Sequence, residues 1–312
     1  MQIIRDYHYV EAEDRGASAA IGNFDGVHIG HQSVIALARS AGDKIDAPLG
    51  VMTFEPHPRQ YFAPQTPSFR LMSAEARASR LAKLGVERLY ELNFNAALSA
   101  LTPREFAQQV IADGLGLRHI VVGADFCFGK DRAGTVTLLQ KYGAKMGFGV
   151  TIAPLLENTA GQVSSTSIRQ ALGAGHPREA ALQLGHWHHI EGPVIGGEQR
   201  GRELGYPTAN MSIDGLHPPK FGVYAVLVEV QDGPHAGSYH GAASLGVRPM
   251  FGVNTANLET FIFDFSGDLY GVTLSVALVD FLRSELKFAG LEPLITQMAA
   301  DCASARSILA AI

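Results

Sequence analysis

The sequence predicts two domains of different class, an α/β domain with a mostly parallel sheet followed by a small antiparallel β domain. Three observations carry this prediction: the length of 312 residues, an alternation of strand-like and helix-like segments in the first half, and a strand-rich pattern after about Gly185. At roughly 150 residues per domain, the length suggests two domains. Strands that alternate with helices favour a parallel sheet covered on both faces, whereas short strands between Gly and Pro turns favour a small barrel.

In the first half, short apolar runs alternate with segments of helical periodicity. Strands are expected at 17–21, 48–54, 88–92, 119–123 and 150–153, and helices from Val34 onward, over 73–84 and over 135–145. Another helix should start at Thr102, because Pro103 suits the first helical position and Glu105 can close a capping box. Ligands of such sheets bind beyond the carboxyl ends of the strands, where we expect a site.

The second half is rich in strand candidates. Strands are expected at 224–230, 257–265 and 272–279, the last with strict alternation of apolar residues. A C-terminal helix is expected, with one apolar stripe formed by Leu291, Leu294, Ile295, Met298, Cys302, Ala305 and Leu309. The domain boundary is placed in the His-rich stretch 185–189, which gives domains 1–186 and 187–312.

The composition excludes several classes of protein. Lys plus Arg is 25 and Asp plus Glu is 30, so the net charge of −5 gives no global attraction for nucleic acid or for an anionic membrane. Cys127 and Cys302 are too far apart for a disulfide framework or a thiolate zinc site. No apolar run approaches 18 residues, and charge follows Met1 closely. A cytoplasmic protein is expected, of an oligomeric state that the sequence does not reveal.

The first candidate site is the glycine-rich stretch 22–31, GNFDGVHIGH, between the first strand and a helix. Glycines permit a tight turn whose amides face an anion at the helix N-terminus. His28 and His31 share a face if the turn is already helical. Two imidazoles there suit a polyphosphate that loses pyrophosphate. The alternative is a turn with two surface histidines, and the stretch is not a Walker A loop.

Three later segments follow expected strands, where this architecture places ligands. They are FEPHPR at 54–59, GADFCFGK at 123–130 and SSTSIR at 164–169. The hydroxyls of the last segment could donate to phosphate beside Arg169, or could simply cap a helix. Phe126 and Phe128 could flank a planar ring, or could belong to the core.

In this order, these strings resemble the FMN adenylyltransferase module of the prokaryotic bifunctional riboflavin kinase/FAD synthetases. The resemblance implies a Rossmann-like nucleotidyltransferase domain. Ala124 and Cys127 depart from the residues usual in that family. The resemblance places on ATP the residues Gly22, Asn23, Phe24, Asp25, His28, His31, Ser164, Ser165, Thr166 and Arg169, and near FMN the residues His57, Pro58, Asp125 and Phe128.

The second candidate site begins with the glycine- and arginine-rich stretch 196–210. Its backbone amides and guanidinium groups could hold phosphates. Thr208 and Asn210 lie two apart, so on an extended segment their oxygens face one side and could bind Mg²⁺. Glu259, on an expected strand, could act as a base. The alternatives are a surface turn and a solvated glutamate.

This half resembles the riboflavin kinase domain through GRELGYPTAN, PKFGVYAV, LGVRPMF, LETFIFDF and FLRSELKF. The resemblance implies a six-stranded antiparallel barrel with a C-terminal helix, Glu259 as the base, Arg283 in a flavin-side flap, and Thr208 with Asn210 on the metal. Met250 departs from the threonine usual in the family. The residues expected on ATP are Gly196, Gly201, Arg202, Tyr206, Pro207, Thr208 and Asn210.

Together these features predict an enzyme that converts riboflavin to FMN with ATP-Mg²⁺, and FMN to FAD with a second ATP and release of pyrophosphate. Its partners would be riboflavin, FMN, FAD and ATP, with no nucleic acid or membrane. Two alternatives stay open, an enzyme with a single active module and a non-catalytic flavin-binding sensor. His186, His188 and His189 offer imidazoles for a metal, but no nearby Cys or acidic pair completes a site, so a structural or exposed role in a linker is favoured.

Overall fold

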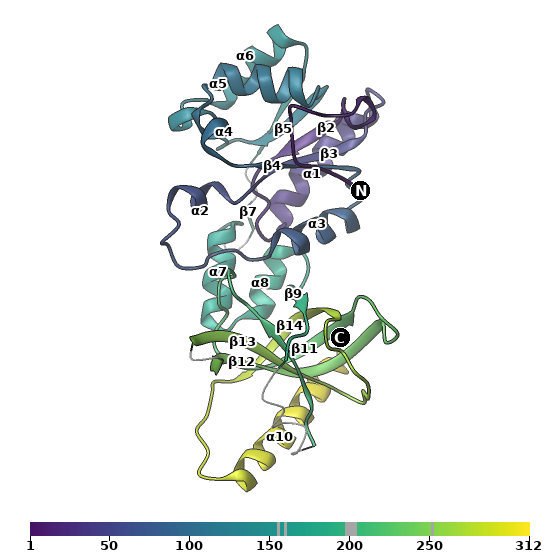
Figure 1. The fold of residues 1–312 in the computed structure, drawn as a ribbon, viewed down its shortest axis with the longest axis vertical. Helices are drawn as coiled ribbons and strands as arrows, with labels where there is room; N and C mark the ends of the chain where they lie inside the picture. The colour runs from purple at the N-terminus through teal and green to yellow at the C-terminus, as the bar shows by residue number, and fades with distance from the viewer. Residues whose placement is uncertain (155–156, 159–160, 197–204, 251–252) are drawn as a thin grey trace. The chain divides into compact units, whose positions relative to one another are not determined.

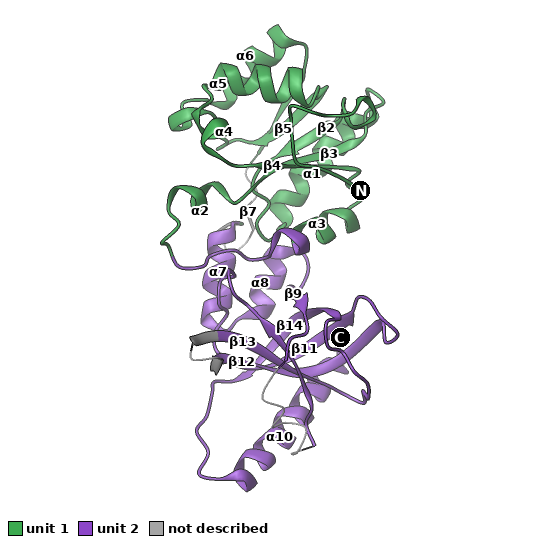
Figure 2. Ribbon diagram, in the orientation of Figure 1, with its two compact units in different colours: residues 1–66, 77–163 green, residues 67–76, 164–312 purple. Residues whose placement is uncertain are grey.

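The chain forms two compact units, shown in Figures 1 and 2. Unit 1 comprises residues 1–66 and 77–163, and unit 2 comprises residues 67–76 and 164–312. The computed structural model describes the chain apart from residues 155–156, 159–160, 197–204 and 251–252. Both expected fold classes are confirmed, one in each unit. The domain boundary expected between 186 and 187 stays a prediction, and compactness divides the chain earlier, after Val163.

Unit 1 is built on a six-stranded sheet in which all paired neighbours are parallel, in the order β1-β4-β3-β2-β5-β6. The strands are β1 (Gln2–Ile4), β2 (Ser18–Ile21), β3 (Leu49–Glu55), β4 (Arg88–Asn93), β5 (His119–Gly123) and β6 (Gly149–Ala153). The five expected strands are confirmed, and the short β1 was not foreseen. Strand order reverses between β2 and β5, which makes their carboxyl ends the switch point where such folds bind ligands.

Helices and turns connect these strands. They are α1 (Ile29–Asp43), α2 (Pro58–Phe62), α3 (Ala74–Lys83), α4 (Ala96–Ala100), α5 (Pro103–Glu105), which continues into a π-helical stretch (Phe106–Gly114), α6 (Val136–Met146), two 3₁₀ turns (Ala12–Asp14 and Lys130–Arg132) and a hairpin of β7 (Glu157–Asn158) and β8 (Gly161–Gln162). The expected capping box of Thr102 and Glu105 is confirmed. The main hydrophobic cluster of the unit includes Met52, Tyr90 and Ile120.

Unit 2 contains an antiparallel sheet in the order β10-β13-β12-β11-β14-β9. Its elements are α7 (Ser165–Ala174), α8 (Pro177–Leu184), β9 (His188–Pro193), β10 (Thr208–Ser212), β11 (Gly222–Val230), β12 (Gly237–Met250), β13 (Val253–Ile262), β14 (Thr273–Arg283) and α10 (Leu291–Leu309). A bridge between Ile195 and Asn210 links the chain after β9 to β10 and so curls the sheet. Helix α10 packs on β11, β12 and β14, as Figure 1 shows.

The His-rich stretch 185–189 was expected to be a linker, but its last two residues belong to a strand. β9 begins at His188, and only 3% of His188 is exposed. The histidines at its start give this strand no continuous apolar run, so the sequence pattern did not predict it. Each ring has its own polar neighbour: His186 Nδ1 lies 2.6 Å from Trp187 O, His188 Nε2 3.0 Å from Leu71 O, and His189 Nδ1 3.0 Å from Ser275 Oγ. In the described part of the chain, no cluster of three His, Cys, Asp or Glu side chains could hold a metal.

Among the helices of the described residues, none is both long and apolar enough to cross a membrane.

Candidate functional sites

The turn after β2 has unusual backbone geometry. Phe24, Gly26 and Val27 have φ values of 51°, 85° and 42°. Positive φ is ordinary for glycine but is uncommon for other residues, and for a β-branched valine it is an outlier. Such conformations persist only where the surroundings hold them, and they cluster at functional sites. The conformation of the turn is therefore held in place by the residues around it.

His28 and His31 come together at the end of this turn. Helix α1 begins at Ile29, five residues before the apolar periodicity suggested, because His28 acts as the N-cap. The His31 backbone N–H donates to His28 Nδ1 at 3.2 Å, and the two rings stack with centroids 3.6 Å apart. A Cβ on Gly30 would lie 3.0 Å from His28 Nδ1, so glycine leaves room for the stack. Since Nδ1 accepts, the proton of neutral His28 is on Nε2, which can donate to a phosphate.

The surroundings keep His31 neutral. Burial, and secondly the neighbouring His28, lower the pKa of His31 well below its ordinary value. Among the described residues, its buried Nδ1 has no hydrogen-bond partner, a feature that often marks functional sites. The neutral imidazole of His31 and the amides of the first turn of α1 can donate to a polyanion without bringing fixed charge of their own.

The segment after β5 emerges beside this turn, because β2 and β5 are paired in parallel. Ala124 and Asp125 are exposed there. Phe126 and Phe128 stack with centroids 5.8 Å apart, and Phe128 is only 5% exposed and belongs to the core. Phe126 is thus the more accessible ring, and the structure supports core packing for Phe128.

The segment after β3 contains a cap and an aromatic cluster. His57 caps α2, where its Nδ1 accepts from the Arg59 amide at 3.0 Å and Pro58 occupies the first turn. Three rings that the sequence analysis missed meet beside it in edge-to-face contacts, with centroids 5.2 to 5.7 Å apart: Tyr61, Phe62 and Phe94. Phe62 is 69% exposed. The adjacent aromatic residues Tyr61 and Phe62, just after the FEPHPR segment, were the sequence signal that could have revealed the cluster.

The SSTSIR segment starts α7, in unit 2. Ser164 and Ser167 form a capping box, which confirms the expected helix cap. Ser165 is half-buried and Thr166 is exposed. The Nε of Arg169 donates to Phe69 O at 2.6 Å, and its guanidinium lies 5.5 Å from the centre of the Phe69 ring. His28 and His31 belong to unit 1, so a shared action of the two segments on one triphosphate stays a prediction.

The second site depends on strand register. Asn210 on β10 pairs directly with Glu259 on β13, and Thr208 lies two residues earlier on the same face. Opposite residues in such a pair have Cβ atoms about 4.5–5.5 Å apart. Leu258 belongs to the barrel core, so the neighbouring Glu259 faces the other side of the sheet. The antiparallel register therefore brings the side-chain oxygens of Thr208, Asn210 and Glu259 to one face of the sheet, although the sequence analysis identified them in separate segments.

A cavity of about 520 Å³ lies over this face. That volume falls within the usual range for pockets that bind small molecules. Its lining includes Tyr206, Thr208, Glu259, Arg283, Phe288 and Met298. The Nη2 and Nε atoms of Arg283 donate to the carboxylate of Asp301 on α10 at 2.6 to 3.0 Å. Asp301, which the sequence did not reveal, thus fixes Arg283 in the cavity wall.

The donor set near Asn210 fits a hard cation such as Mg²⁺, which prefers oxygen ligands. Asn210 Oδ1 accepts a hydrogen bond at 3.0 Å from Nδ2 of Asn257, which is only 3% exposed. Asn210 Nδ2 donates to Thr208 O at 3.3 Å, so the amide is oriented at both ends. Gly196 and Pro207 are exposed. Gly201 and Arg202 lie outside the described residues, as does the side chain of Met250.

Comparison with known proteins assigns a different family model to each half of the chain. Residues 10–167 match the family model for FAD synthetase, and residues 184–309 match the family model for riboflavin kinase. A bifunctional riboflavin kinase/FMN adenylyltransferase of Pseudomonas fluorescens is 42% identical over 311 residues, which cover 99% of this chain and 98% of the relative. This chain belongs to the bifunctional riboflavin kinase/FMN adenylyltransferase family.

A second curated relative and a solved structure are also similar over nearly the whole chain. The bifunctional riboflavin kinase/FMN adenylyltransferase of Escherichia coli K12 is 36% identical over 307 residues, 98% of this chain and 97% of the relative. A crystal structure described as a macrolide-efflux protein from Streptococcus pneumoniae superposes with a TM-score of 0.82 at 34% identity and covers 96% of both chains. The expected family and fold class are therefore confirmed, and the two alternatives to a bifunctional enzyme are not favoured.

Proposed function

We infer that this chain makes FAD from riboflavin in two ATP-dependent steps, one at each site. The observation that carries the inference is that two family models divide the chain between them, and each includes one of the two clusters described above. The substrates and products are riboflavin, FMN, FAD and ATP. A cytoplasmic location stays a prediction.

In the first step, the 5′-hydroxyl of riboflavin attacks the γ-phosphate of ATP, and FMN and ADP are formed. Glu259 faces the cavity and accepts the hydroxyl proton. Thr208 and Asn210 are proposed to hold Mg²⁺, which when bound would neutralise phosphate charge. Arg283 lines the same cavity, and we propose on the strength of the family resemblance that it contacts the flavin. Gly196, Gly201, Arg202, Tyr206 and Pro207 are proposed to bind ATP on the strength of the family resemblance.

In the second step, the phosphate of FMN attacks the α-phosphate of a second ATP, and FAD and pyrophosphate are formed. The nucleophile is already anionic, so the residues need to position it and to stabilise charge more than to remove a proton. We propose that His28 and His31 donate to the phosphates at the switch point, beside Gly22, Asn23, Phe24 and Asp25. Ser164, Ser165, Thr166 and Arg169 are proposed as further ATP ligands.

The flavin of the second step needs a planar apolar surface. We propose that it lies near His57, Pro58 and Asp125, with Phe62 and Phe126 as ring contacts. Phe62 is 69% exposed in an edge-to-face cluster, so it can cover a flavin ring without disturbing the core. Phe128, proposed from the resemblance, would act from beneath Phe126.

A time course with the whole chain tests the proposal. Incubation with riboflavin, ATP and Mg²⁺ should give FMN first and FAD later, with one ADP and one pyrophosphate per FAD, as measured by chromatography. Supply of FMN in place of riboflavin should give FAD and pyrophosphate without ADP. FMN without FAD from riboflavin would indicate that only the kinase module is active, and FAD from FMN with no product from riboflavin would indicate that only the adenylyltransferase module is active. Bound flavin with no consumption of ATP would indicate a sensor.

A further inference from the structure

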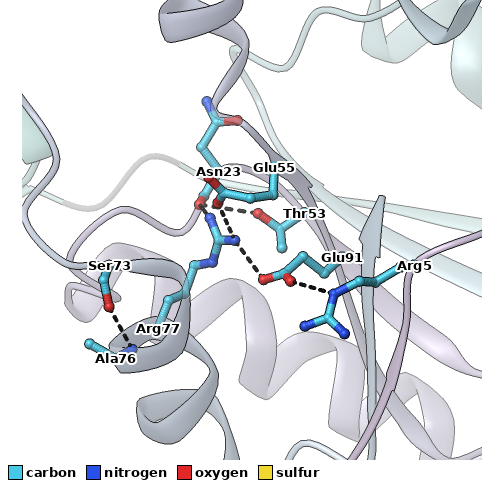
Figure 3. A network of polar contacts seen from close by, with 8 residues as sticks. All are labelled: Arg5, Asn23, Thr53, Glu55, Ser73, Ala76, Arg77 and Glu91. Atoms are coloured by element: carbon cyan, nitrogen blue, oxygen red, sulfur yellow. Dashed lines mark hydrogen bonds and ion pairs between the residues drawn. The ribbon is translucent and has the colours of Figure 1, made fainter. Parts of the chain in front are cut away.

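A buried network of charges connects strand ends in unit 1, as Figure 3 shows. The side chain of Arg77, on α3, is 1% exposed, and its Nη2 atom donates to Glu55 Oε2 and to Glu91 Oε2, both at 3.0 Å. Glu91 also accepts from the Nε of Arg5 at 3.2 Å. Two arginines and two glutamates thus balance their charges where β1 and β3 end.

The same arginine reaches the turn of the adenylyltransferase site. Asn23 O accepts from Arg77 Nη1 at 3.4 Å and from Thr53 Oγ1 at 3.2 Å. Figure 3 shows the Asn23 amide side chain pointing away from the network, so the contact is with its backbone. Thr53 is fully buried. Two donors from the sheet and from α3 therefore hold one carbonyl of the turn.

That carbonyl lies directly before the strained part of the turn. Phe24 follows Asn23 with φ of 51°, and Val27, with φ of 42°, precedes His28. Backbone in such sparsely populated regions persists only when its surroundings hold it. Stability alone does not account for Arg77, because a buried ion pair is often no more stabilising than apolar side chains of similar size.

We propose that Arg77 is a positioning residue for FMN adenylylation, which holds Asn23 O and thereby fixes the orientation of His28 and of the first amides of α1. Helix α3 gives Arg77 a rigid base, since the Ser73 Oγ accepts from the Ala76 amide at 3.1 Å where the helix begins. The inference rests on the proposed role of His28 and His31. A misplacement of about 1 Å in such a site can cost about 10²-fold in rate.

Kinetics of Arg77→Met and Arg77→Lys in the whole chain test this role. With FMN and ATP as substrates, Arg77→Met should lower kcat by roughly 10–100-fold and change each KM by less than about threefold, because misaligned donors matter most in the transition state. Arg77→Lys should retain more activity than Arg77→Met, because a lysine keeps the charge. It should remain below the original enzyme, because a lysine cannot bridge the same oxygens. Riboflavin phosphorylation by the same samples should stay unchanged.

Arg88→Met is the matched control. Arg88 lies at the N-terminal end of β4 and pairs with Asp14 at 2.8 Å, with 24% of the Arg88 side chain exposed. Loss of this pair should leave the kcat of adenylylation within about threefold of the original value, since it contacts no part of the turn. An equal loss in Arg77→Met and Arg88→Met would show that Arg77 is merely structural and would overturn the proposal.

A less disruptive variant, Thr53→Val, still tests the proposal if Arg77→Met does not fold. Thr53→Val removes the second donor to Asn23 O with little change of shape. The effects of Thr53→Val and Arg77→Lys on kcat should be non-additive, because both act on one carbonyl. Additive effects would contradict the proposal. If His31→Ala leaves adenylylation intact, the proposed site is wrong; if His31→Ala abolishes it while both Arg77 variants are fully active, only the role of Arg77 is wrong.

Discussion

The two sites proposed to handle phosphate are assembled in different ways. In unit 1, His28, His31 and the helix amides come from one short stretch between β2 and α1. In unit 2, Asn210 and Glu259 come from different strands and meet only through the pairing of β10 with β13. The first site therefore depends on local backbone geometry, whereas the second depends on register, where a slip of one residue would turn every side chain to the other face.

The largest test of this comparison is Glu259→Gln, which keeps the shape of the side chain and removes the proposed base. Riboflavin phosphorylation should fall by roughly 10²–10⁴-fold, the usual contribution of a general base. FMN adenylylation should be unchanged, because Glu259 belongs to unit 2 and His28 to unit 1. Chromatography of products from riboflavin and from FMN measures both steps. Equal loss of both in a folded protein would contradict the division of function.

His31→Ala is the converse test. It removes one donor and half of the imidazole stack, so FMN adenylylation should fall by roughly 10²–10³-fold. Riboflavin should still become FMN at the original rate, and this step serves as the control for folding of the other unit. Accumulation of FAD at the normal rate would show that the stacked pair does not handle phosphate.

Much of the fold was predictable because its signals are local. Continuous apolar runs such as 119–123 predicted β5 with its correct bounds. The strand β12 (Gly237–Met250) was not foreseen, because its small residues and glycines show neither alternation nor a continuous apolar run. β1 has only three residues and is stabilised by its pairing with β4. Tertiary pairing, and not local preference, makes both of these strands.

The site residues, like the strands, were predictable only where the signal is local. The stretch 22–31 could be interpreted directly, because its candidate phosphate-binding residues are neighbours in the sequence. The supporting residues could not, because each meets its partner far along the chain: Asn257 lies 47 residues from Asn210, and Arg77 lies 54 from Asn23. A polar residue that orients another carries no motif of its own, so only register and packing reveal it.

Asn257→Leu tests the register-dependent site more finely. It removes the hydrogen bond to Asn210 Oδ1 and replaces a buried amide with an apolar side chain of similar size. The Mg²⁺ concentration needed for half-maximal riboflavin phosphorylation should rise about 10-fold, as is typical when the partner of a metal ligand is lost. FMN adenylylation, titrated with Mg²⁺ in the same samples, is the control. An unchanged Mg²⁺ requirement would show that Asn257 does not orient Asn210.

The smallest expected effect concerns the stability of unit 2 and the buried His188 that the sequence placed in a linker. Burial lowers the pKa of His188 to about 4, opposed by the hydrogen bond with Leu71 O and aided by the charges of His186 and His217. The unfolded chain takes up this proton below about pH 6.5 and the folded chain does not, so stability is full above pH 6.5 and is lost as the pH falls towards 4. Between pH 7 and pH 5 the loss should be about 2 kcal/mol, at about 1.4 kcal/mol per pKa unit.

Urea unfolding measures this dependence through the fluorescence of Trp187, the single tryptophan. The pH dependence of the unfolding free energy should be reduced in His188→Phe and retained in His240→Gln, which changes an exposed histidine of the same unit. Equal pH dependence in both variants would mean that His188 is protonated as easily in the folded chain as in the unfolded one.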